Sequence, residues 1–433
     1  MKKTIIPILV LSSVLTITSC GGGKKDGETS SNSTEQSSSE PLPTDMLPNE
    51  QLWKEKEYTS IEEALKVPAE QVYRLNLSNK NLTALPLEVL KFTKLQYLNL
   101  YGNIGITDLP KEIGSLKRLQ WLMLSAGMTK IPEGVFELGN LQELDCGYIK
   151  QGKVDDKIAN LKNLKRLYLG NNDLNEFPMV VLQLTNLEHL HLHYNKKIPS
   201  IPSEINKLTH LKELFVQGNQ LTTLPATIGD LKELYDLEAQ ENQITSVPKE
   251  IGNCTKLYRL FLDKNKLTEI PDMFATLSEL RGVRFENNDL KQLPSSMANL
   301  SGISGSFGGN ANLDLKQACE VIAQMKGKNL RISFYQQKGM NGDLTLPAEI
   351  SKCTNISDLD LRGNKINFQA EIEKLSKMTS LETLSVKDCG FTSLPSNLNK
   401  LKNLKQISLT EEISKKEEAK LKKDLPNTKV VNY

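Results

Sequence analysis

The sequence of 433 residues lacks the features that define several protein classes. Of its six cysteines, Cys146, Cys254, Cys353 and Cys389 stand where small buried residues are expected, which argues against a disulfide framework, and no C-x-x-C pair occurs. The 54 basic and 52 acidic residues leave a formal charge of +2, too little to attract nucleic acid or an anionic membrane. An apolar run at residues 5–17 is too short for a comfortable membrane span.

Motifs for catalysis are also missing. The chain has no G-x-S-x-G, no H-E-x-x-H and no attached segment large enough for a separate catalytic domain. Gly147, Gly152 and Lys153 have the spacing of a phosphate loop, but Val154 stands where a serine or threonine would bind magnesium. We therefore expect neither an enzyme nor a bound cofactor.

What the chain does have is a repeat of about 23 residues. Residues 211–225, LKELFVQGNQLTTLP, have the pattern L-x-x-L-x-L-x-x-N-x-L-x-x-L-P. Copies begin at residues 72, 95, 119, 141, 164, 187, 211, 234, 257, 280, 356, 381 and 404. The interval from 280 to 356 spans about three periods, so we expect two degenerate copies there and about fifteen in all.

The spacing of the apolar residues predicts an α/β solenoid. The fourth and sixth places alternate with a polar residue, as in a strand that points both apolar side chains inward. Strands of successive copies would stack in parallel as one concave sheet, in which each copy buries the apolar face of the next. The ninth place lies at the turn out of the strand, where a side-chain amide can satisfy buried backbone groups in a hydrogen-bonded ladder. The asparagines at this place are Asn103, Asn172, Asn195, Asn219, Asn242, Asn265, Asn288 and Asn364.

The pattern resembles the 23-residue form of the leucine-rich repeat. That resemblance implies an arc closed by N- and C-terminal caps, with a protein ligand held on the concave face of the sheet. We expect the caps at residues 49–71 and 412–433, and the repeats at 72–411 with an irregular stretch at 301–343. In the first cap, Ser60 and Glu63 form a capping box, and Trp53, Tyr58, Ile61 and Leu65 would cover the first coil.

The start of the chain has the pattern of a secretory signal. Lys2 and Lys3 precede the apolar run, and small residues come before Cys20. The ITSC ending resembles a bacterial lipobox, which implies a signal peptide at residues 1–19 and lipidation of Cys20. Residues 20–48 are rich in serine, glycine and charge, so we expect a flexible tether. This predicts a lipid-anchored protein of the bacterial cell envelope, with the outer membrane favoured by the glycine after Cys20.

The outward slots at the third and fifth places of each strand decide what the sheet can bind. Large aromatic side chains clustered with arginine are typical of protein-binding hot spots. The candidate ligand-binding residues are Tyr97, Trp121, Met123, Arg166, Tyr168, His189, His191, Glu213, Phe215, Asp236, Arg259 and Phe261. After residue 356 the slots hold small polar residues such as Asp358 and Asp360, which we interpret as inert.

Three of the four histidines, His189, His191 and His193, alternate along one strand. With Glu213 on the next strand, two of them could hold zinc. Arg166 should flank His189 and oppose a cation, so we favour imidazoles that contribute to a ligand surface, with no metal.

The sequence therefore predicts a lipid-anchored, monomeric, non-enzymatic recognition protein with a protein ligand and no nucleic-acid partner. Two other interpretations stay open. Tyr97, Trp121, Tyr168 and Phe215 could stack on sugar rings in a glycan-binding protein. The chain could also be a structural spacer of the cell envelope with no ligand.

Overall fold

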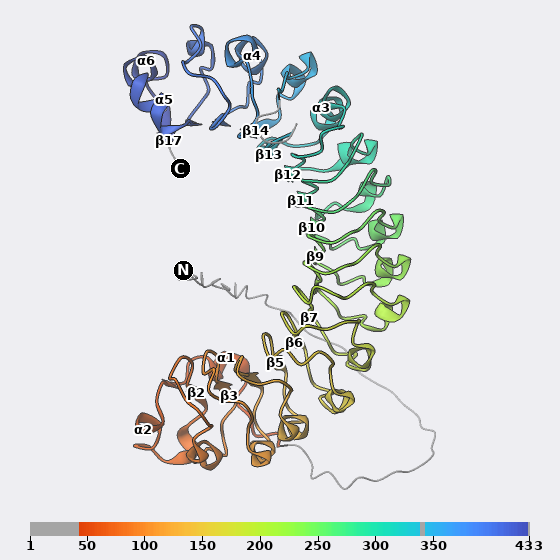
Figure 1. Ribbon diagram of the computed structural model, residues 1–433, viewed down its shortest axis with the longest axis vertical. Coiled ribbons are helices and arrows are strands. Elements are labelled where there is room, and N and C mark those ends of the chain that lie inside the picture. The colour runs from red at the N-terminus through yellow and green to blue at the C-terminus, as the bar shows by residue number, and fades with distance from the viewer. Residues whose placement is uncertain (1–42, 338–342, 432–433) are drawn as a thin grey trace, which may run out of the picture. The chain divides into compact units, whose positions relative to one another are not determined.

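A computed structural model describes residues 43–337 and 343–431, and we refer to these as the described residues. They belong to one compact unit. The expected signal peptide, Cys20 and most of the expected tether lie outside the described residues. Seventeen parallel strands pair in chain order into a single sheet, which lines the inner side of an open arc (Figure 1).

The strands are short, and most contain three residues. Their bounds are β1 Glu57–Tyr58, β2 Arg74–Asn76, β3 Tyr97–Asn99, β4 Trp121–Met123, β5 Glu143–Asp145, β6 Arg166–Tyr168, β7 His189–His191, β8 Glu213–Phe215, β9 Asp236–Glu238, β10 Arg259–Phe261, β11 Gly282–Arg284, β12 Ser304–Ser306, β13 Leu330–Ser333, β14 Ile356–Asp360, β15 Thr383–Ser385, β16 Gln406–Ser408 and β17 Lys429–Val431.

Most helical segments lie on the opposite, convex side of the arc, whereas α1 lies on the inner side (Figure 1). The α-helices are α1 Asn49–Leu52, α2 Ile61–Ala64, α3 Leu315–Gln324, α4 Phe368–Leu375, α5 Glu411–Lys416 and α6 Glu418–Asp424. The 3-10 helices are η1 Ala69–Gln71, η2 Leu87–Lys91, η3 Lys111–Ser115, η4 Glu133–Glu137, η5 Asp156–Asn160, η6 Met179–Gln183, η7 Ser203–Lys207, η8 Ala226–Asp230, η9 Lys249–Asn253, η10 Phe274–Thr276, η11 Ser295–Asn299, η12 Ala348–Lys352 and η13 Leu398–Lys400. Within the described residues, no helix has the length and apolarity needed to cross a bilayer.

The strands confirm the expected number of repeats. Each readable copy supplies one strand, which begins at the third place in every copy except that at 356, where β14 begins at the first place; β12 and β13 add the two degenerate copies. The apolar side chains of the pattern are buried, as Leu211, Leu214 and Val216 illustrate with at most 1% exposure. They join one continuous core that runs from β1 to the last helix. The five described cysteines lie buried and unpaired, in agreement with a role as small core residues.

The ninth-place amides connect neighbouring coils, as the ladder hypothesis requires. Asn242 is a representative member: its Nδ2 donates to the carbonyl of Val216 at 3.0 Å and of Ala239 at 3.1 Å. Its Oδ1 accepts from the backbone N–H of Leu221 at 3.0 Å. The degenerate copies continue the ladder with Asn310, whose Nδ2 donates to the carbonyl of Phe307 at 2.7 Å.

The irregular stretch contains one helix, α3, that is longer than the usual 3-10 turns. The helix α3 begins after Asp314, whose side chain accepts from the backbone N–H of Gln317 at 3.1 Å. A ten-residue α-helix needs more chain than the usual 3-10 turn. The extra residues are on the convex side, so β12 remains in register with β11 and β13, while β13 pairs with β14 with one shift of register between Leu330 and Arg331.

The caps differ from expectation in detail. Tyr58 lies in β1 beside β2, and Ile61 packs on the core, as expected of a cap. The expectation is wrong for Leu65, which is 47% exposed. It is also wrong for Trp53, whose ring lies against Tyr97 and Trp121. At the other end the cap consists of α5 and α6, which are divided at Glu417, and of β17, which adds the last strand.

Replacing Asn242 with alanine should lower the thermal unfolding temperature by several degrees. The change leaves buried backbone donors and acceptors unpaired, at about 1–3 kcal/mol for each group. The control is Asn186→Ala, because Asn186 also bridges coils, through Nδ2 to the carbonyl of Lys162 at 2.9 Å, but is exposed to water. Equal melting temperatures for the two variants would contradict the ladder.

Candidate recognition surface

The first described residues fold back over the concave face. We call residues 43–53 the N-terminal strap. Asp45 pairs with Lys94 and accepts from Nε of Arg118 at 2.9 Å, at the edge where the strands begin. The hydrogen bonds from Lys94 and Arg118 lower the pKa of Asp45 to about 2. Residues 43–48 were expected to belong to the tether, and this expectation is wrong because they contact three coils.

The strap ends in α1, which covers the sheet at β3 and β4 (Figure 1). Leu52 is fully buried and forms a separate cluster with Tyr97 and Trp121. The ring of Trp53 meets Tyr97 edge-on at 5.4 Å and Trp121 at 5.3 Å between centroids. The guanidinium of Arg74 lies 4.7 Å from the centre of the Trp53 ring.

The strap removes two candidate residues from the open surface. Tyr97 is 7% exposed and Trp121 is 3% exposed, so the expectation that they face a ligand is wrong. Met123 is half-buried and packs beside the same cluster. The sequence does not reveal that the strap covers these rings, because the strap is short and its contacts are to residues far along the chain.

Five other candidates meet on β6, β7 and β8, and we call them the histidine patch: Tyr168, His189, His191, Glu213 and Phe215. Strand register aligns Tyr168, His191 and Phe215 across the three strands. The ring of His191 stacks on Phe215 with centroids 4.1 Å apart and meets the edge of Tyr168 at 4.7 Å. The patch is therefore a connected group of rings from neighbouring coils.

A carboxylate joins the two histidines of the patch. One oxygen of Glu213 is 2.8 Å from Nδ1 of His189 and 3.2 Å from Nε2 of His191. Burial alone would raise the pKa of Glu213, but the hydrogen bonds from both histidines outweigh it and hold the pKa well below its usual range. Burial also raises the pKa of the Tyr168 hydroxyl, so this group stays protonated and can donate to a ligand.

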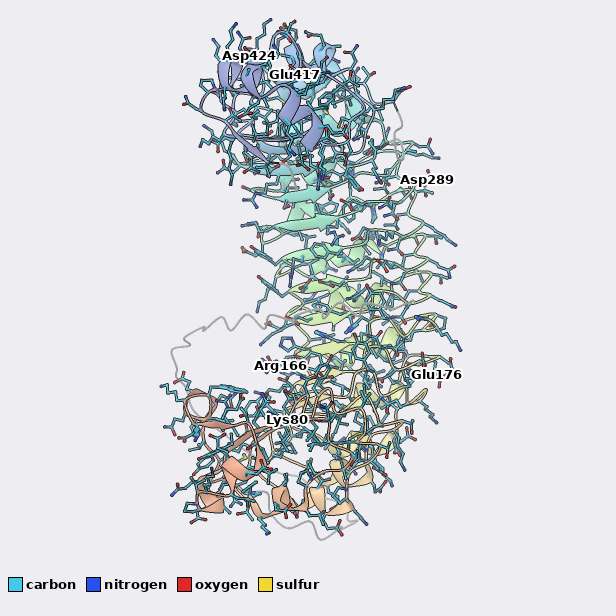
Figure 2. The ribbon with its side chains drawn as sticks, turned by 60° about the vertical axis from the view of Figure 1, so that its left-hand side comes forward. Lys80, Arg166, Glu176, Asp289, Glu417 and Asp424 are labelled. Atoms are coloured by element: carbon cyan, nitrogen blue, oxygen red, sulfur yellow. The ribbon has the colours of Figure 1, made fainter. Side chains whose placement is uncertain are left out.

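Arg166 flanks His189 in the strand register, as expected, but its charge also has a partner on the other side. Its NH1 lies 3.5 Å from a carboxylate oxygen of Glu143, on the strand away from the patch. Figure 2 shows where Arg166 lies among the side chains of the arc. The positive charge is therefore balanced locally. His193 lies apart from Glu213, and burial lowers the pKa of its ring to about 4.

The three remaining candidates lie on β9 and β10, the strands that follow the histidine patch: Asp236, Arg259 and Phe261. Asp236 is fully buried and forms an ion pair with Arg259. Burial is the largest cause that raises the pKa of Asp236, to about 7, against the opposing effect of Arg259. The ring of Phe261 lies under the guanidinium of Arg284 at 5.1 Å. Arg259 and Phe261 then form one wall of a hollow.

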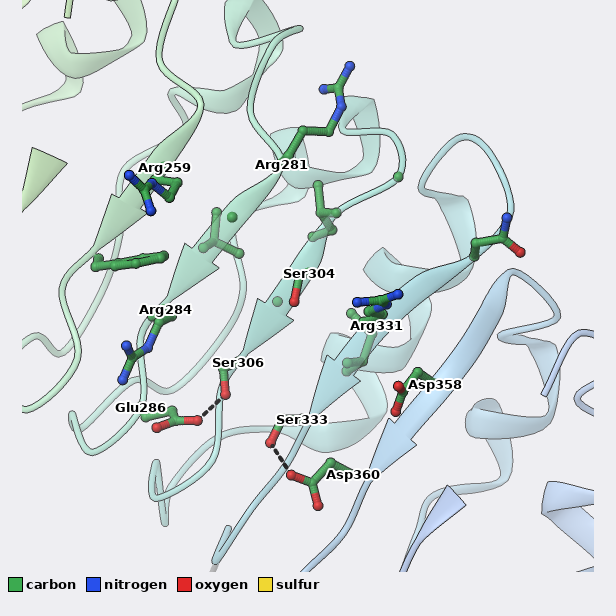
Figure 3. Close-up of a pocket in the computed structure, with 18 of the residues that line it drawn as sticks. Arg259, Arg281, Arg284, Glu286, Ser304, Ser306, Arg331, Ser333, Asp358 and Asp360 are labelled. Atoms are coloured by element: carbon green, nitrogen blue, oxygen red, sulfur yellow. Dashed lines mark hydrogen bonds between the residues drawn. The ribbon is translucent and has the colours of Figure 1, made fainter. Parts of the chain in front are cut away.

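We call this open hollow of about 820 Å³ over β10–β14 the arginine hollow (Figure 3). Its floor is low because the outward slots of β11, β12 and β13 hold Gly282, Ser304, Ser306 and Ser333. A Cβ added at Gly282 would lie 3.3 Å from Arg259 and 3.4 Å from Phe261, so the glycine keeps the wall open.

Charged side chains surround the floor. Arg284 and Arg331 approach from β11 and β13, while Asp358 and Asp360 come from β14 (Figure 3). The hydroxyl of Ser333 donates to Asp360 at 3.2 Å. Asp358 and Asp360, which we interpreted as inert from the sequence, both line this hollow. Among the described residues Arg331 has no ion-pair partner within 4.0 Å, which leaves its guanidinium available to a ligand.

The sequence analysis missed Arg331 and the serines because degenerate copies hid their register. A signal was present: Phe307 and Asn310 have the spacing of the sixth and ninth places, which assigns Ser304 and Ser306 to outward slots.

Trp121 should fluoresce as a buried tryptophan while the strap is in place. The chain has two tryptophans, so Trp53→Phe leaves Trp121 alone as the reporter. Adding Leu52→Asp places a carboxylate in the buried cluster and should shift the emission to longer wavelength. The control, Gln51→Asp, adds the same charge on the exposed side of α1. Water-exposed emission from Trp53→Phe alone would contradict the covered position of Trp121.

Comparison with solved structures supports the solenoid. A leucine-rich repeat protein of Leptospira interrogans is 27% identical, covers 87% of this chain and 99% of its own, and superposes with a TM-score of 0.58. A plant peptide hormone receptor, RGFR1 in complex with RGF2, is 23% identical, with 79% of this chain and 63% of that chain covered and a TM-score of 0.52.

Sequence comparison gives the same result over shorter stretches. Residues 185–233 match the family model described as leucine-rich repeats in two copies. The human volume-regulated anion channel subunit LRRC8A is 30% identical over 193 residues, which are 36% of this chain and 23% of that protein. The chain spans less than a third of the length of the curated relatives it matches. The repeat pattern, the parallel sheet and these likenesses together show that the described residues form a leucine-rich repeat solenoid.

Proposed function

We propose that the protein is a non-enzymatic recognition protein that holds a protein ligand on the concave face of its solenoid. The leucine-rich repeat fold is a scaffold suited to protein interaction. The observation that supports this ligand site is the continuity of the histidine patch with the arginine hollow, which share one face between β6 and β14. Rings and arginines in this arrangement are the side chains that dominate binding energy at protein interfaces.

The two regions favour different parts of a ligand. Tyr168 and Phe215 present apolar ring surface beside polar groups, which suits an aromatic or aliphatic side chain of the partner. Arg331 offers bidentate hydrogen bonds to a carboxylate. The neighbouring Asp358 and Asp360 would repel a wholly acidic segment, so a partner with both charge signs fits the hollow best. We therefore expect one extended protein surface to contact both regions.

We also propose that the protein is lipid-anchored through Cys20 in a bacterial cell envelope, with the outer membrane as its location. The support is the sequence of residues 1–20, with its basic start, apolar run and ITSC ending. More than one acyl chain on Cys20 would make the anchor effectively permanent, at about 0.8 kcal/mol for each buried methylene. The tether would then join this anchor to the strap.

The glycan alternative has less support than the protein ligand. It relied on four rings, and Tyr97 and Trp121 are covered by the strap. Tyr168 and Phe215 remain, but Phe215 already stacks on His191. A spacer with no ligand would have no use for half-exposed rings at the centre of the sheet. A protein ligand accounts for these rings most directly.

Alanine at Tyr168 or Phe215 should each weaken binding of the ligand by at least about 2 kcal/mol, roughly thirtyfold. The protein would be used to capture partners from envelope and host extracts, and a captured partner would be purified and titrated against each variant. Met179→Ala is the control, because Met179 is 51% exposed on η6 of the same coil as Tyr168 but lies away from the sheet.

Arg331→Ala tests the hollow in the same titration and should also weaken binding. Equal affinities for wild type, Tyr168→Ala and Phe215→Ala would place the ligand elsewhere. A specific signal on a glycan array, with no captured protein, would favour the glycan alternative.

Cys20→Ser should move the protein from the membrane fraction to the soluble fraction. Serine lacks the thiol to which the lipid is attached, so the mature chain would carry no anchor. Uptake of labelled fatty acid by wild type and not by the variant provides the second readout. Retention of the variant in the membrane pellet, without label in wild type, would refute lipidation.

A further inference from the structure

We propose that His189, His191 and Glu213 form a binding site for a zinc ion or a similar divalent transition metal on the concave face. The side chains come from the adjacent strands β7 and β8, and the register pairs His189 with Glu213. One ligand atom from each residue lies within 4.8 Å of the other two. Two imidazoles and one carboxylate are ligands that zinc takes in proteins.

The distances in this cluster are close to those of a tetrahedral metal site. Ligand atoms at about 2.0–2.1 Å from one zinc ion stand about 3.3 Å apart in a tetrahedron. The Glu213 oxygen lies 2.8 Å from Nδ1 of His189 and 3.2 Å from Nε2 of His191. An ion can therefore be accepted after small side-chain rotations, in which the coordinating nitrogen of each neutral imidazole presents its lone pair to the metal while the ring proton resides on the other nitrogen; an imidazolium would first release one proton to water.

Neighbouring rings already hold one of the ligands in place. His191 lies stacked on Phe215 and against the edge of Tyr168, which restricts rotation of its imidazole. The side chains of the three ligands are 12–27% exposed, so an ion can reach them from solvent. A site that is both ordered and accessible loses less entropy on binding than one built from mobile surface residues.

The charges around the cluster also favour a cation. Arg166 and Glu143 form one ion pair, and Arg259 and Asp236 form another, so these arginines are balanced. Asp145 acts electrostatically on His191 from β5 and adds negative charge on that side. The charge of Arg166, which flanks His189 and was expected to oppose a cation, is therefore offset by its ion pair with Glu143.

Three protein ligands leave a fourth position open on the concave side. Water would fill this position in the free chain, and a histidine or carboxylate of a bound protein could replace it. Metal binding to the free chain does not depend on the proposed protein ligand, so the two ideas can fail separately.

The test is a calorimetric titration of full-length protein with Zn²⁺ alone, followed by Co²⁺ as a spectroscopic probe. We expect one Zn²⁺ per chain and the visible d–d absorption of a low-coordinate cobalt complex. Glu213→Gln and His191→Ala should each weaken Zn²⁺ binding by at least roughly tenfold, since even residues behind the ligands contribute that much at metal sites. His210→Ala is the matched control, because His210 is the one exposed histidine outside the strand.

Thermal unfolding of each variant without metal checks that it is folded. Zn²⁺ should raise the melting temperature of wild type and His210→Ala but not of Glu213→Gln, and His189→Gln supplies a second ligand variant. No saturable binding by wild type would overturn the proposal. So would unchanged binding by the ligand variants, or a sulfur-to-cobalt charge-transfer band, which would indicate one of the cysteines instead.

Discussion

The buried turn at the end of each strand is the constraint on which the solenoid depends. Its backbone groups cannot reach water, and the side-chain amide at the ninth place bonds to carbonyls of its own coil and of the coil before it, as Asn242 does. An unpaired buried group costs about 1–3 kcal/mol, so the amide and its spacing must recur together. This requirement keeps the strands in register while helices on the convex side change length. It also leaves the outward slots free to vary, and those slots carry the recognition surface.

Much of this architecture could be predicted from sequence because it follows from a period. The fifteen strands of the repeats, β2 to β16, depend on contacts between adjacent copies, and so do the buried leucines and the amide ladder. The strap could not be predicted in this way. Its contacts, such as Asp45 with Arg118, join residues 73 positions apart and belong to no repeat. Tyr97 and Trp121 were therefore taken for exposed rings, although Leu52 covers them.

The difference between contacts that follow the repeat and contacts outside it also explains which residues of the site could be predicted from the sequence. Tyr168, His191 and Phe215 occupy one slot in three successive copies, so alternation alone predicted their contact. The arginine hollow depends on small residues within degenerate copies, where the pattern is weakest. A loss of side-chain volume at Gly282 and Ser304 produces the hollow, while Arg331 from a degenerate copy and charged residues from regular copies surround it. Departures from a repeat thus mark the places where its surface can become specific.

Photocrosslinking in the producing cell tests the proposed recognition face most directly. A benzophenone amino acid at Phe261, between the histidine patch and the arginine hollow, should form an adduct with a protein partner on illumination. The same residue at Leu87, which is 64% exposed on η2 of the convex side, should form none. Adducts from Leu87 alone, or none from Phe261 in cells that hold the partner, would contradict recognition by the concave face.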